Sequence, residues 1–238
     1  MNFDELWPGG PRFYQAEGSF RLSTDSVMLA DFSAAVRAKS IIDLGCGAGV
    51  VTVLLHRSHP AAAIDGVEIQ PESASLCREN LAANGFSSDG ILTADLRRHR
   101  EFLTAGAYDL VVSNPPYFPV GSGYTAPDAS RASARDERDC TLADLCTAAA
   151  YLCRFGGAFT LVHRPERLSE IFCTLTANGL EPKRLRMVHH RPGTAPSLVL
   201  IEARRGGKPG LTVEAPLVLC NSDGSDSAEA RRIYHRGE

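Results

Sequence analysis

The sequence predicts an α/β fold with a doubly wound, mostly parallel sheet of seven strands that carries an antiparallel hairpin at one edge. Runs rich in Val, Ile and Leu alternate with segments of helical periodicity over residues 40–178. Two later apolar runs, 184–190 and 197–203, are joined by too few residues for a helical crossover and must pair antiparallel. The hydrophobic fraction of 44% is that of an ordinary soluble domain with a real core.

The individual elements follow from turn signals in chain order. The predicted strands before the hairpin cover residues 40–44, 62–68, 90–94, 108–113 and 158–163. The predicted helices cover residues 50–57, 72–84, 141–154 and 165–178. Pro71 and Pro165 stand at the starts of two of these helices, and Gly85 and Gly179 stand at their ends.

The chain divides into three segments. Residues 1–39 form an N-terminal segment with a leading helix, residues 40–205 form the α/β domain, and residues 206–238 form a C-terminal extension of that domain. Glycine and serine are frequent in this extension, so we expect it to be loosely structured.

Composition excludes several classes of protein. No run approaches the roughly 18 to 20 apolar residues of a membrane-spanning helix, and the acidic residues 1–5 do not begin a signal peptide. The net charge of −3 argues against a non-specific nucleic-acid coat. The seven cysteines contain no C-x-x-C pair. We therefore expect a cytoplasmic protein with no membrane partner and no metal site.

A glycine-rich loop marks the first candidate site. Residues 43–49 read Asp-Leu-Gly-Cys-Gly-Ala-Gly between a strand and a helix, where glycines let the backbone approach a ligand closely. A dinucleotide fingerprint would need glycine in place of Val50. Glu68 ends the second predicted strand and Asp95 follows the third, at the same predicted edge of the sheet, and Glu68 can accept hydrogen bonds from two ribose hydroxyls. A tight turn and helix-capping acids are the alternatives.

This loop resembles motif I of class I S-adenosylmethionine-dependent methyltransferases. The resemblance implies a Rossmann-like fold that binds S-adenosylmethionine, with Asp43 near the methionine amino group and Asp95 at the adenine amine. It implies these cofactor-binding residues: Thr24, Asp25, Asp43, Gly45, Gly47, Gly49, Glu68, Asp95, Leu96 and Asn114.

The most specific motif is Asn114-Pro115-Pro116-Tyr117, at the end of the fourth predicted strand. It resembles the tetrapeptide of methyltransferases that act on amino groups of adenine, cytosine or glutamine. An exocyclic amine shares its lone pair with the ring or carbonyl, so it needs activation. The Asn114 side-chain oxygen and the Pro115 carbonyl can accept its two N–H bonds and aim the lone pair at the methyl donor. The prolines lock the loop, and Tyr117 can stack on the flipped-out base.

Further segments are similar to the tRNA1(Val) (adenine(37)-N6)-methyltransferase family. The similarity comprises residues 15–32 as a leading helix beside the cofactor pocket, residues 131–137 (Arg-Ala-Ser-Ala-Arg-Asp-Glu), residues 197–207 and residues 215–217. Asp136 stands where this family usually has His. The resemblance implies methyl transfer to N6 of adenine in a tRNA partner, at adenine 37 of tRNA1(Val).

Other functions remain open. A glutamine-N5 methyltransferase of release factors shares the Asn-Pro-Pro-Tyr motif but usually has a helical domain before the glycine loop, for which these roughly 40 residues are too few. Another RNA adenine-N6 methyltransferase and a non-catalytic RNA-binding protein are further alternatives. Residues 164–208 contain nine Lys or Arg against four Glu. We expect this region, including Lys183, Arg184 and Arg186, to contact tRNA phosphates together with Arg131 and Arg135.

Overall fold

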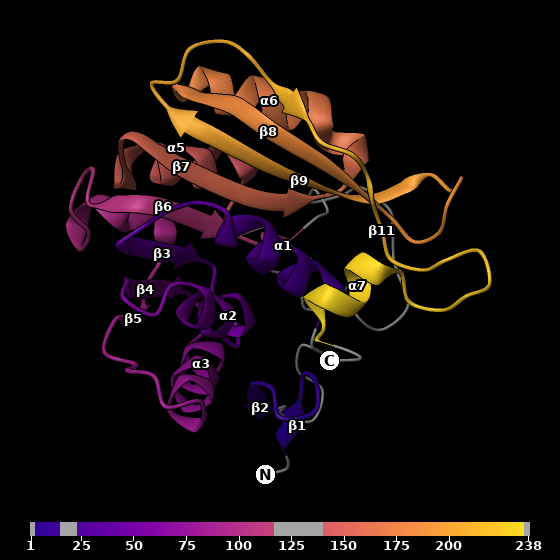
Figure 1. The fold of residues 1–238 in the computed structure, drawn as a ribbon. Helices are drawn as coiled ribbons and strands as arrows, with labels where there is room; N and C mark the ends of the chain where they lie inside the picture. Colours follow the sequence, from indigo (N-terminus) through magenta and orange to yellow (C-terminus); the bar gives the residue numbers. More distant parts are fainter. Residues whose placement is uncertain (1–2, 15–22, 117–139, 236–238) are drawn as a thin grey trace, which may run out of the picture.

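The central feature of the fold is one nine-stranded sheet (Figure 1). It is seen in a computed structural model that describes residues 3–14, 23–116 and 140–235. In spatial order the strands are β10 (Thr212–Val213), β8 (Leu180–His189), β9 (Pro196–Arg205), β7 (Cys153–His163), β6 (Tyr108–Ser113), β3 (Ser40–Leu44), β4 (Ala63–Glu68) and β5 (Ile91–Thr93). The ninth strand, β11 (Leu217–Val218), pairs with β8 beyond β10.

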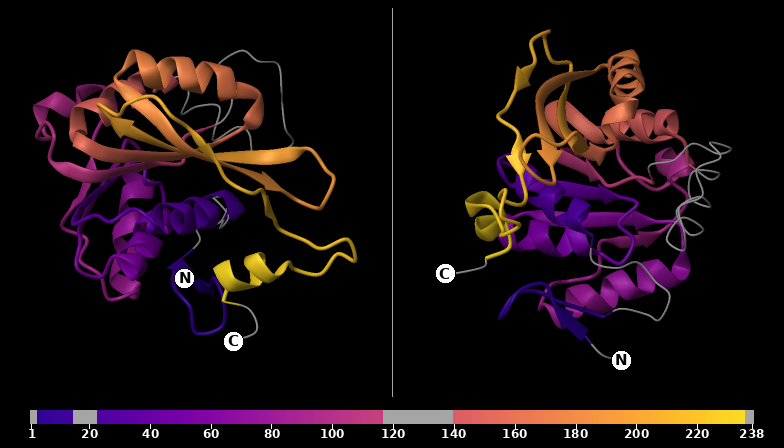
Figure 2. Two further views of the ribbon diagram at one scale, coloured as in Figure 1. Left: turned by 45° about the horizontal axis from the view of Figure 1, so that its top comes forward. Right: turned by 90° about the vertical axis from the view of Figure 1, so that its right-hand side faces the viewer.

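Helices cover both faces of this sheet (Figure 2). On one face lie α1 (Thr24–Ala34), α2 (Val50–Ser58) and α3 (Pro71–Ala83), and on the other α5 (Leu142–Leu152) and α6 (Leu168–Ala177). Successive strand residues serve opposite faces: Ile41 joins the apolar core beneath α1 and α2, whereas Ile42 joins the core beneath α5. The predicted doubly wound α/β class is confirmed.

The predicted hairpin is also confirmed, because β8 and β9 pair antiparallel. The strand count is corrected from seven to nine. Strands β10 and β11 add to the open side of β8, so that the hairpin does not form the edge of the sheet there. Two-residue strands carry too little periodicity to be recognised in a sequence.

Three boundaries differ from the prediction by three residues or more. Strand β8 begins at Leu180, four residues before the predicted start. Residues 153–154, expected at the end of a helix, instead begin β7, which is eleven residues long and starts directly after α5. The predicted helix 165–178 is divided into a 3-10 turn, η2 (Pro165–Arg167), followed by α6. Helix α5 ends ahead of Gly156 and Gly157, the nearest turn signals, and Pro165 begins a 3-10 turn rather than the α-helix itself.

The N-terminal segment forms a hairpin that the sequence did not reveal. Its strands are β1 (Phe3–Glu5) and β2 (Arg12–Tyr14), which pair antiparallel. Two side-chain amides hold β2: Asn84, the C-cap of α3, exchanges hydrogen bonds with the Arg12 backbone, and Asn80 of α3 accepts one from the Tyr14 N–H at 2.7 Å. Asn80 also donates to the Ala48 carbonyl, so this hairpin is tied to the glycine loop.

Residues 206–235 of the C-terminal extension carry defined secondary structure, contrary to the expected loose structure. It contains β10, β11 and a short helix, α7 (Ala228–Ile233). The ring of His235 lies against Trp7 with centroids 4.5 Å apart and the ring planes tilted by 34°, which brings the two described ends of the chain together (Figure 1). Within the described ranges 3–14, 23–116 and 140–235, none of the helices combines the length and apolar character needed to cross a bilayer.

Candidate active site

The candidate site lies where the winding of the sheet reverses. From β3 the chain builds outward through β4 and β5, then returns to β6 on the other side of β3. Open α/β sheets bind ligands at this switch point, outside the carboxyl ends of the strands. The glycine loop follows β3 and Asn114 follows β6. The buried Ser113 hydroxyl donates to the Leu44 carbonyl at 2.7 Å, which holds the two strand ends together.

The glycine loop is shaped by three residues with positive φ: +74° at Gly45, +53° at Gly47 and +82° at Gly49. A Cβ added at Gly45 or Gly47 would meet nothing within 4 Å, whereas one at Gly49 would lie 2.6 Å from Cys77 Sγ. Gly49 therefore serves close packing at the start of α2. Gly45 and Gly47 leave the backbone open on the side where a ligand would approach.

Glu68, the last residue of β4, connects this strand to the glycine loop. One of its carboxylate oxygens accepts from the Gly47 N–H and the other from the Gln70 N–H, both at 2.9 Å. The residue is 7% exposed. Carboxylate oxygens are also the acceptors that ligand hydroxyls require. Glu68 thus fixes the loop and retains the chemistry expected of a ribose acceptor.

Asp43 lies inside the protein rather than on the open side of the loop. It is 1% exposed, and its carboxylate accepts a hydrogen bond from the Thr52 hydroxyl of α2 at 2.8 Å. Burial raises the pKa of Asp43 to about 7, and the nearby negative charge of Glu68 acts in the same direction. Cys46 is buried beside Cys77, whose hydrogen bond together with burial raises the pKa of the Cys46 thiol well above its ordinary value.

Asp95 follows β5 and caps the 3-10 helix η1 (Leu96–Glu101). Its carboxylate accepts from the Arg97 backbone N–H at 2.9 Å and pairs with the Arg97 guanidinium at 2.6 Å. The hydrogen bonds from Arg97 hold the pKa of Asp95 below its ordinary value. Leu96 is 9% exposed, so only a small part of it can contact a ligand. The capping alternative for Asp95 is therefore realised, and a bound adenine would share this carboxylate with Arg97.

Asn114 is held by the leading helix. Its Nδ2 donates to the Ser26 hydroxyl at 3.0 Å, in the first turn of α1 beside the partly buried Thr24 and Asp25. Sequence reasoning missed Ser26 and Ser113. Their partners lie 88 and 69 residues away, a separation at which no spacing pattern operates. Helix α1 therefore contributes to the site through a side chain as well as through its position.

The remaining motif residues are described only in part. Pro115 and Pro116 are partly buried at the carboxyl end of β6. Tyr117 lies outside the described residues, as do Arg131, Arg135 and Asp136. The expected stacking by Tyr117 therefore stays a prediction, and so do the expected RNA contacts of Arg131 and Arg135.

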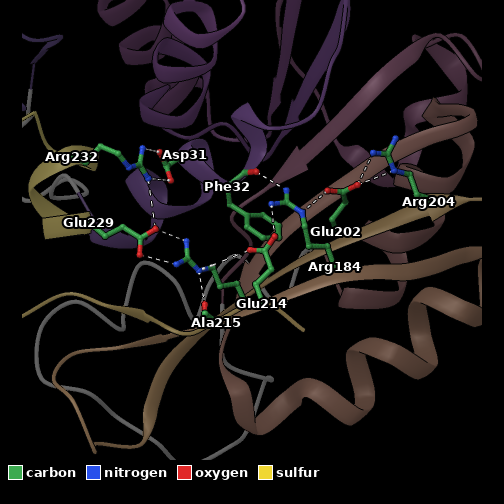
Figure 3. Close-up of polar contacts among 10 residues, drawn as sticks. Asp31, Phe32, Arg184, Glu202, Arg204, Glu214, Ala215, Glu229 and Arg232 are labelled. Carbon is green, nitrogen blue, oxygen red and sulfur yellow. Dashed lines mark hydrogen bonds and ion pairs between the residues drawn. The ribbon is translucent and has the colours of Figure 1, made fainter. Parts of the chain in front are cut away.

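The expected phosphate contacts of Arg184 and Arg186 are not supported by the structure. Both side chains belong to an ion-pair network between β8, β9, α1 and the C-terminal extension (Figure 3). Arg184 bonds Glu202 at 2.9 Å and the Phe32 carbonyl at 2.8 Å, and its guanidinium lies 3.7 Å from the centre of the Phe32 ring. Arg186 donates two hydrogen bonds, of 2.7 and 2.8 Å, to the Glu229 carboxylate.

This network, defined as Asp31, Arg184, Arg186, Glu202, Arg204, Glu214, Glu229 and Arg232, contains four acids and four arginines. Three of the acids, Asp31, Glu214 and Glu229, lie outside residues 164–208, so counting charges in that segment overstated its positive surface. Lys183 donates to the Lys208 carbonyl at 3.0 Å and remains the one member of the expected trio outside the network.

Cation ligands do not converge in the described structure. Across residues 3–14, 23–116 and 140–235, no three side chains of His, Cys, Asp or Glu gather in a group that could hold a metal ion.

Comparison with known proteins agrees with this geometry. Residues 21–125 match the family model "Methyltransferase small domain". The chain resembles a Tolumonas auensis tRNA1(Val) (adenine(37)-N6)-methyltransferase, with 32% identity over 213 residues that cover 89% of this chain and 86% of that protein. A protein of the same name from Porphyromonas gingivalis is 32% identical over 196 residues, covering 78% of this chain and 75% of that protein.

Solved structures share the fold. An Agrobacterium tumefaciens structure described as a "predicted O-methyltransferase" matches with a TM-score of 0.73 and 24% identity, covering 90% of this chain and 96% of that one. The Thermus thermophilus 16S rRNA N2 G1207 methyltransferase matches with a TM-score of 0.54 and 21% identity, covering 79% of this chain and 44% of that one. The glycine loop and the Asn-Pro-Pro segment at the switch point agree with the sequence relatives. These relatives show that the chain belongs to the tRNA1(Val) (adenine(37)-N6)-methyltransferase family.

Proposed function

We propose that this enzyme transfers a methyl group from S-adenosylmethionine to the exocyclic N6 of adenine in tRNA, at adenine 37 of tRNA1(Val). One observation carries the proposal: Asn114, fixed by Ser26, lies at the end of β6, next to the end of β3 where the glycine loop begins. This juxtaposition is what transfer between a nucleotide-like cofactor and an amine requires. Because the proposed substrate is tRNA, we place the enzyme in the cytoplasm.

The residues at the switch point fit the cofactor. The backbone is open at Gly45 and Gly47, and the Glu68 carboxylate faces this loop closely enough to bond the Gly47 N–H. Glu68 would hold the ribose hydroxyls, and Gly45 and Gly47 would admit the cofactor against the main chain. When bound, S-adenosylmethionine supplies an electrophilic methyl group on a positively charged sulfur.

Asn114 and Pro115 would activate the amine. The adenine amino group is a weak nucleophile because its lone pair is shared with the ring. Asn114 Oδ1 and the Pro115 carbonyl would each accept one N–H bond and turn the lone pair out of the ring plane toward the methyl group. Neither Pro115 nor Pro116 has an N–H, so both restrict the loop without adding a competing donor.

Asp43 would act indirectly. Its carboxylate is committed to Thr52 and buried, so it would support the glycine loop rather than bind the methionine amino group directly. The residues 206–235 would belong to the same domain, because the ion-pair network attaches them to α1, β8 and β9.

The proposal is tested by incubating the purified enzyme with labelled S-adenosylmethionine and unmodified total tRNA, in parallel with a purified release factor. Nucleoside mass spectrometry should then find N6-methyladenosine in the tRNA, and sequencing of the modified tRNA should place it at position 37 of tRNA1(Val). Label on the release factor alone would replace this proposal with glutamine methylation.

A further inference from the structure

We infer that Ser26 is a positioning residue for methyl transfer: its hydroxyl fixes the Asn114 amide in the orientation that presents Oδ1 to the substrate amine. This inference rests on the proposed function. Its structural basis is the 3.0 Å hydrogen bond from Asn114 Nδ2 to Ser26 Oγ, which joins the end of β6 to the first turn of α1.

The orientation of this amide matters because its two ends have opposite hydrogen-bonding character. The oxygen accepts, whereas the NH2 group donates. A substrate amine brings N–H donors, so an amide turned by 180° would set donor against donor and lose the activating bond. Ser26 is only 3% exposed, so bulk water does not reach this contact to replace the serine hydroxyl. The orientation of the Asn114 amide therefore depends on Ser26, a residue outside the Asn-Pro-Pro-Tyr motif.

A serine hydroxyl can donate or accept, so Ser26 alone would not distinguish the two amide orientations. The Ser23 hydroxyl lies 3.1 Å from Ser26 Oγ, and either hydroxyl of this pair can be the donor. Ser23 also caps α1 by accepting the Ser26 backbone N–H at 3.3 Å. The inferred arrangement is the one with the Ser26 proton directed to Ser23, which leaves a lone pair of Ser26 Oγ facing Asn114 Nδ2.

The helix that carries Ser26 is anchored independently. The Ser33 hydroxyl bonds Thr160 of β7 at 2.7 Å, and Asp31 pairs with Arg232 at 2.9 Å. Ser33 therefore provides a matched control, because it is another buried serine of α1, 0% exposed, whose hydroxyl also bonds a side chain of the sheet. Removing the Ser33 hydroxyl takes away its bond to Thr160, whereas removing the Ser26 hydroxyl takes away its bonds to Asn114 and Ser23. Of the two serines, Ser26 is the one bonded to Asn114.

The test compares Ser26→Ala, Ser26→Thr and Ser33→Ala with the wild type, using unmodified tRNA and labelled S-adenosylmethionine. Ser26→Ala should lower kcat roughly tenfold to a hundredfold, the size expected for a misplaced catalytic group, with KM for tRNA and the cofactor Kd unchanged. Ser26→Thr should restore most of kcat because it keeps the hydroxyl. Ser33→Ala should keep kcat while its thermal stability falls. Equal kcat in Ser26→Ala and Ser33→Ala would overturn the inference.

A second measurement separates this inference from the proposed function. The side-chain amide signals of Asn114 in a 15N NMR spectrum are identified by their loss in Asn114→Ala. Ser26→Ala should shift these signals and speed their exchange with solvent, and Ser33→Ala should leave them unchanged. Unchanged signals in Ser26→Ala would show that the contact is not made. A wild type that methylates no tRNA would instead overturn the proposed function, and with it the role of Ser26, whatever the spectrum shows.

Discussion

The switch point and the ion-pair network use charged and polar side chains in opposite ways. At the switch point Glu68 and Asn80 bond backbone groups, and the loop they support stays open at Gly45 and Gly47. In the network, arginines of β8 and β9 bond acids from α1 and the C-terminal extension, so their charges neutralise one another. Polar groups that support the backbone can shape a binding site, whereas those that pair with each other stabilise a contact between segments.

This difference shows which sequence signals predict function. Acids and glycines at the carboxyl ends of successive strands indicate a ligand site because the topology brings those ends to one edge. Arginines within an alternating strand pattern carry no such information, since distant acids can neutralise them. The two regions should therefore respond to substitution differently, the first in turnover or binding and the second in stability.

The largest effect on turnover is expected from substitution of Asn114. In Asn114→Ala, kcat should fall roughly 100- to 1,000-fold, the range seen when one hydrogen-bonding group of a preorganised site is removed. Cofactor affinity, measured by calorimetry, should stay at the wild-type value. Asn178→Ala is the matched control, since Asn178 also bonds through its amide, to Thr147 and Thr174, on the α5 and α6 side of the sheet. Equal loss of cofactor binding in Asn114→Ala would contradict this division of roles.

A pH titration of stability should identify Asp43 as a buried acid with a raised pKa. Its pKa is about 7 in the folded protein against an ordinary 3.8, so the folded state holds the proton more tightly. The stabilisation that Asp43 contributes by holding a proton is therefore complete below about pH 4 and declines as the pH rises to about 7, above which it stays lost. The total loss is about 1.4 kcal/mol for each unit by which the two pKa values differ. Urea unfolding between pH 4.5 and 8 should show this decline in the wild type relative to Asp43→Asn. Parallel curves for the two proteins would count against the raised pKa.

In the network, Arg186→Ala should lower the free energy of unfolding by about 2 kcal/mol, because it leaves Glu229 and the Ala215 carbonyl without their shared donor. Lys183→Ala, on the same strand, should change stability by less than about 0.5 kcal/mol. Urea denaturation measures both values. Binding of tRNA by folded Arg186→Ala should match the wild type across salt concentrations, and a flatter salt dependence would restore this arginine as a phosphate contact.

The smallest effect is expected on cofactor affinity, in a comparison of two glycines with nearly the same backbone geometry. Gly45 has φ +74° and Gly85 has φ +76°, and a Cβ at either would meet nothing within 4 Å. Alanine at either position should cost about 1 to 2 kcal/mol of stability through the left-handed backbone. Gly45→Ala alone should also weaken S-adenosylmethionine binding, by about tenfold as measured by calorimetry, because its methyl group enters the ligand side of the loop. An equal change in affinity for both variants would place the cofactor elsewhere.

Much of the sheet could be predicted from local sequence. Strands β3 and β6 have the predicted bounds because each apolar run ends abruptly, at the glycine loop and at Asn114-Pro115. The same local signals failed at the start of β7, where the chain changes from helix to strand at Cys153, ahead of the glycines at 156 and 157.

The site was predictable only where its residues stand at strand ends. Family resemblance and strand ends together identified Glu68, the glycines and Asn114 as candidates, and the structure brings them to one edge of the sheet. Ser26, Ser113 and the acid partners of Arg184 and Arg186 depend on pairings 18 to 88 residues apart. Such pairings follow from the three-dimensional arrangement, which no single segment encodes.

The position of β9 has a consequence for how the chain is made. Strand β9 follows β8 in sequence but lies between β7 and β8 in the sheet. During synthesis on a ribosome, β8 emerges before the strand that must separate it from β7, so the edge of β7 stays unpaired until residue 205 has been added. Unpaired strand edges are where nascent chains aggregate. In the finished sheet β9 pairs with both neighbours and covers this edge of β7, and residues 206–235 leave the ribosome only after β9 has done so.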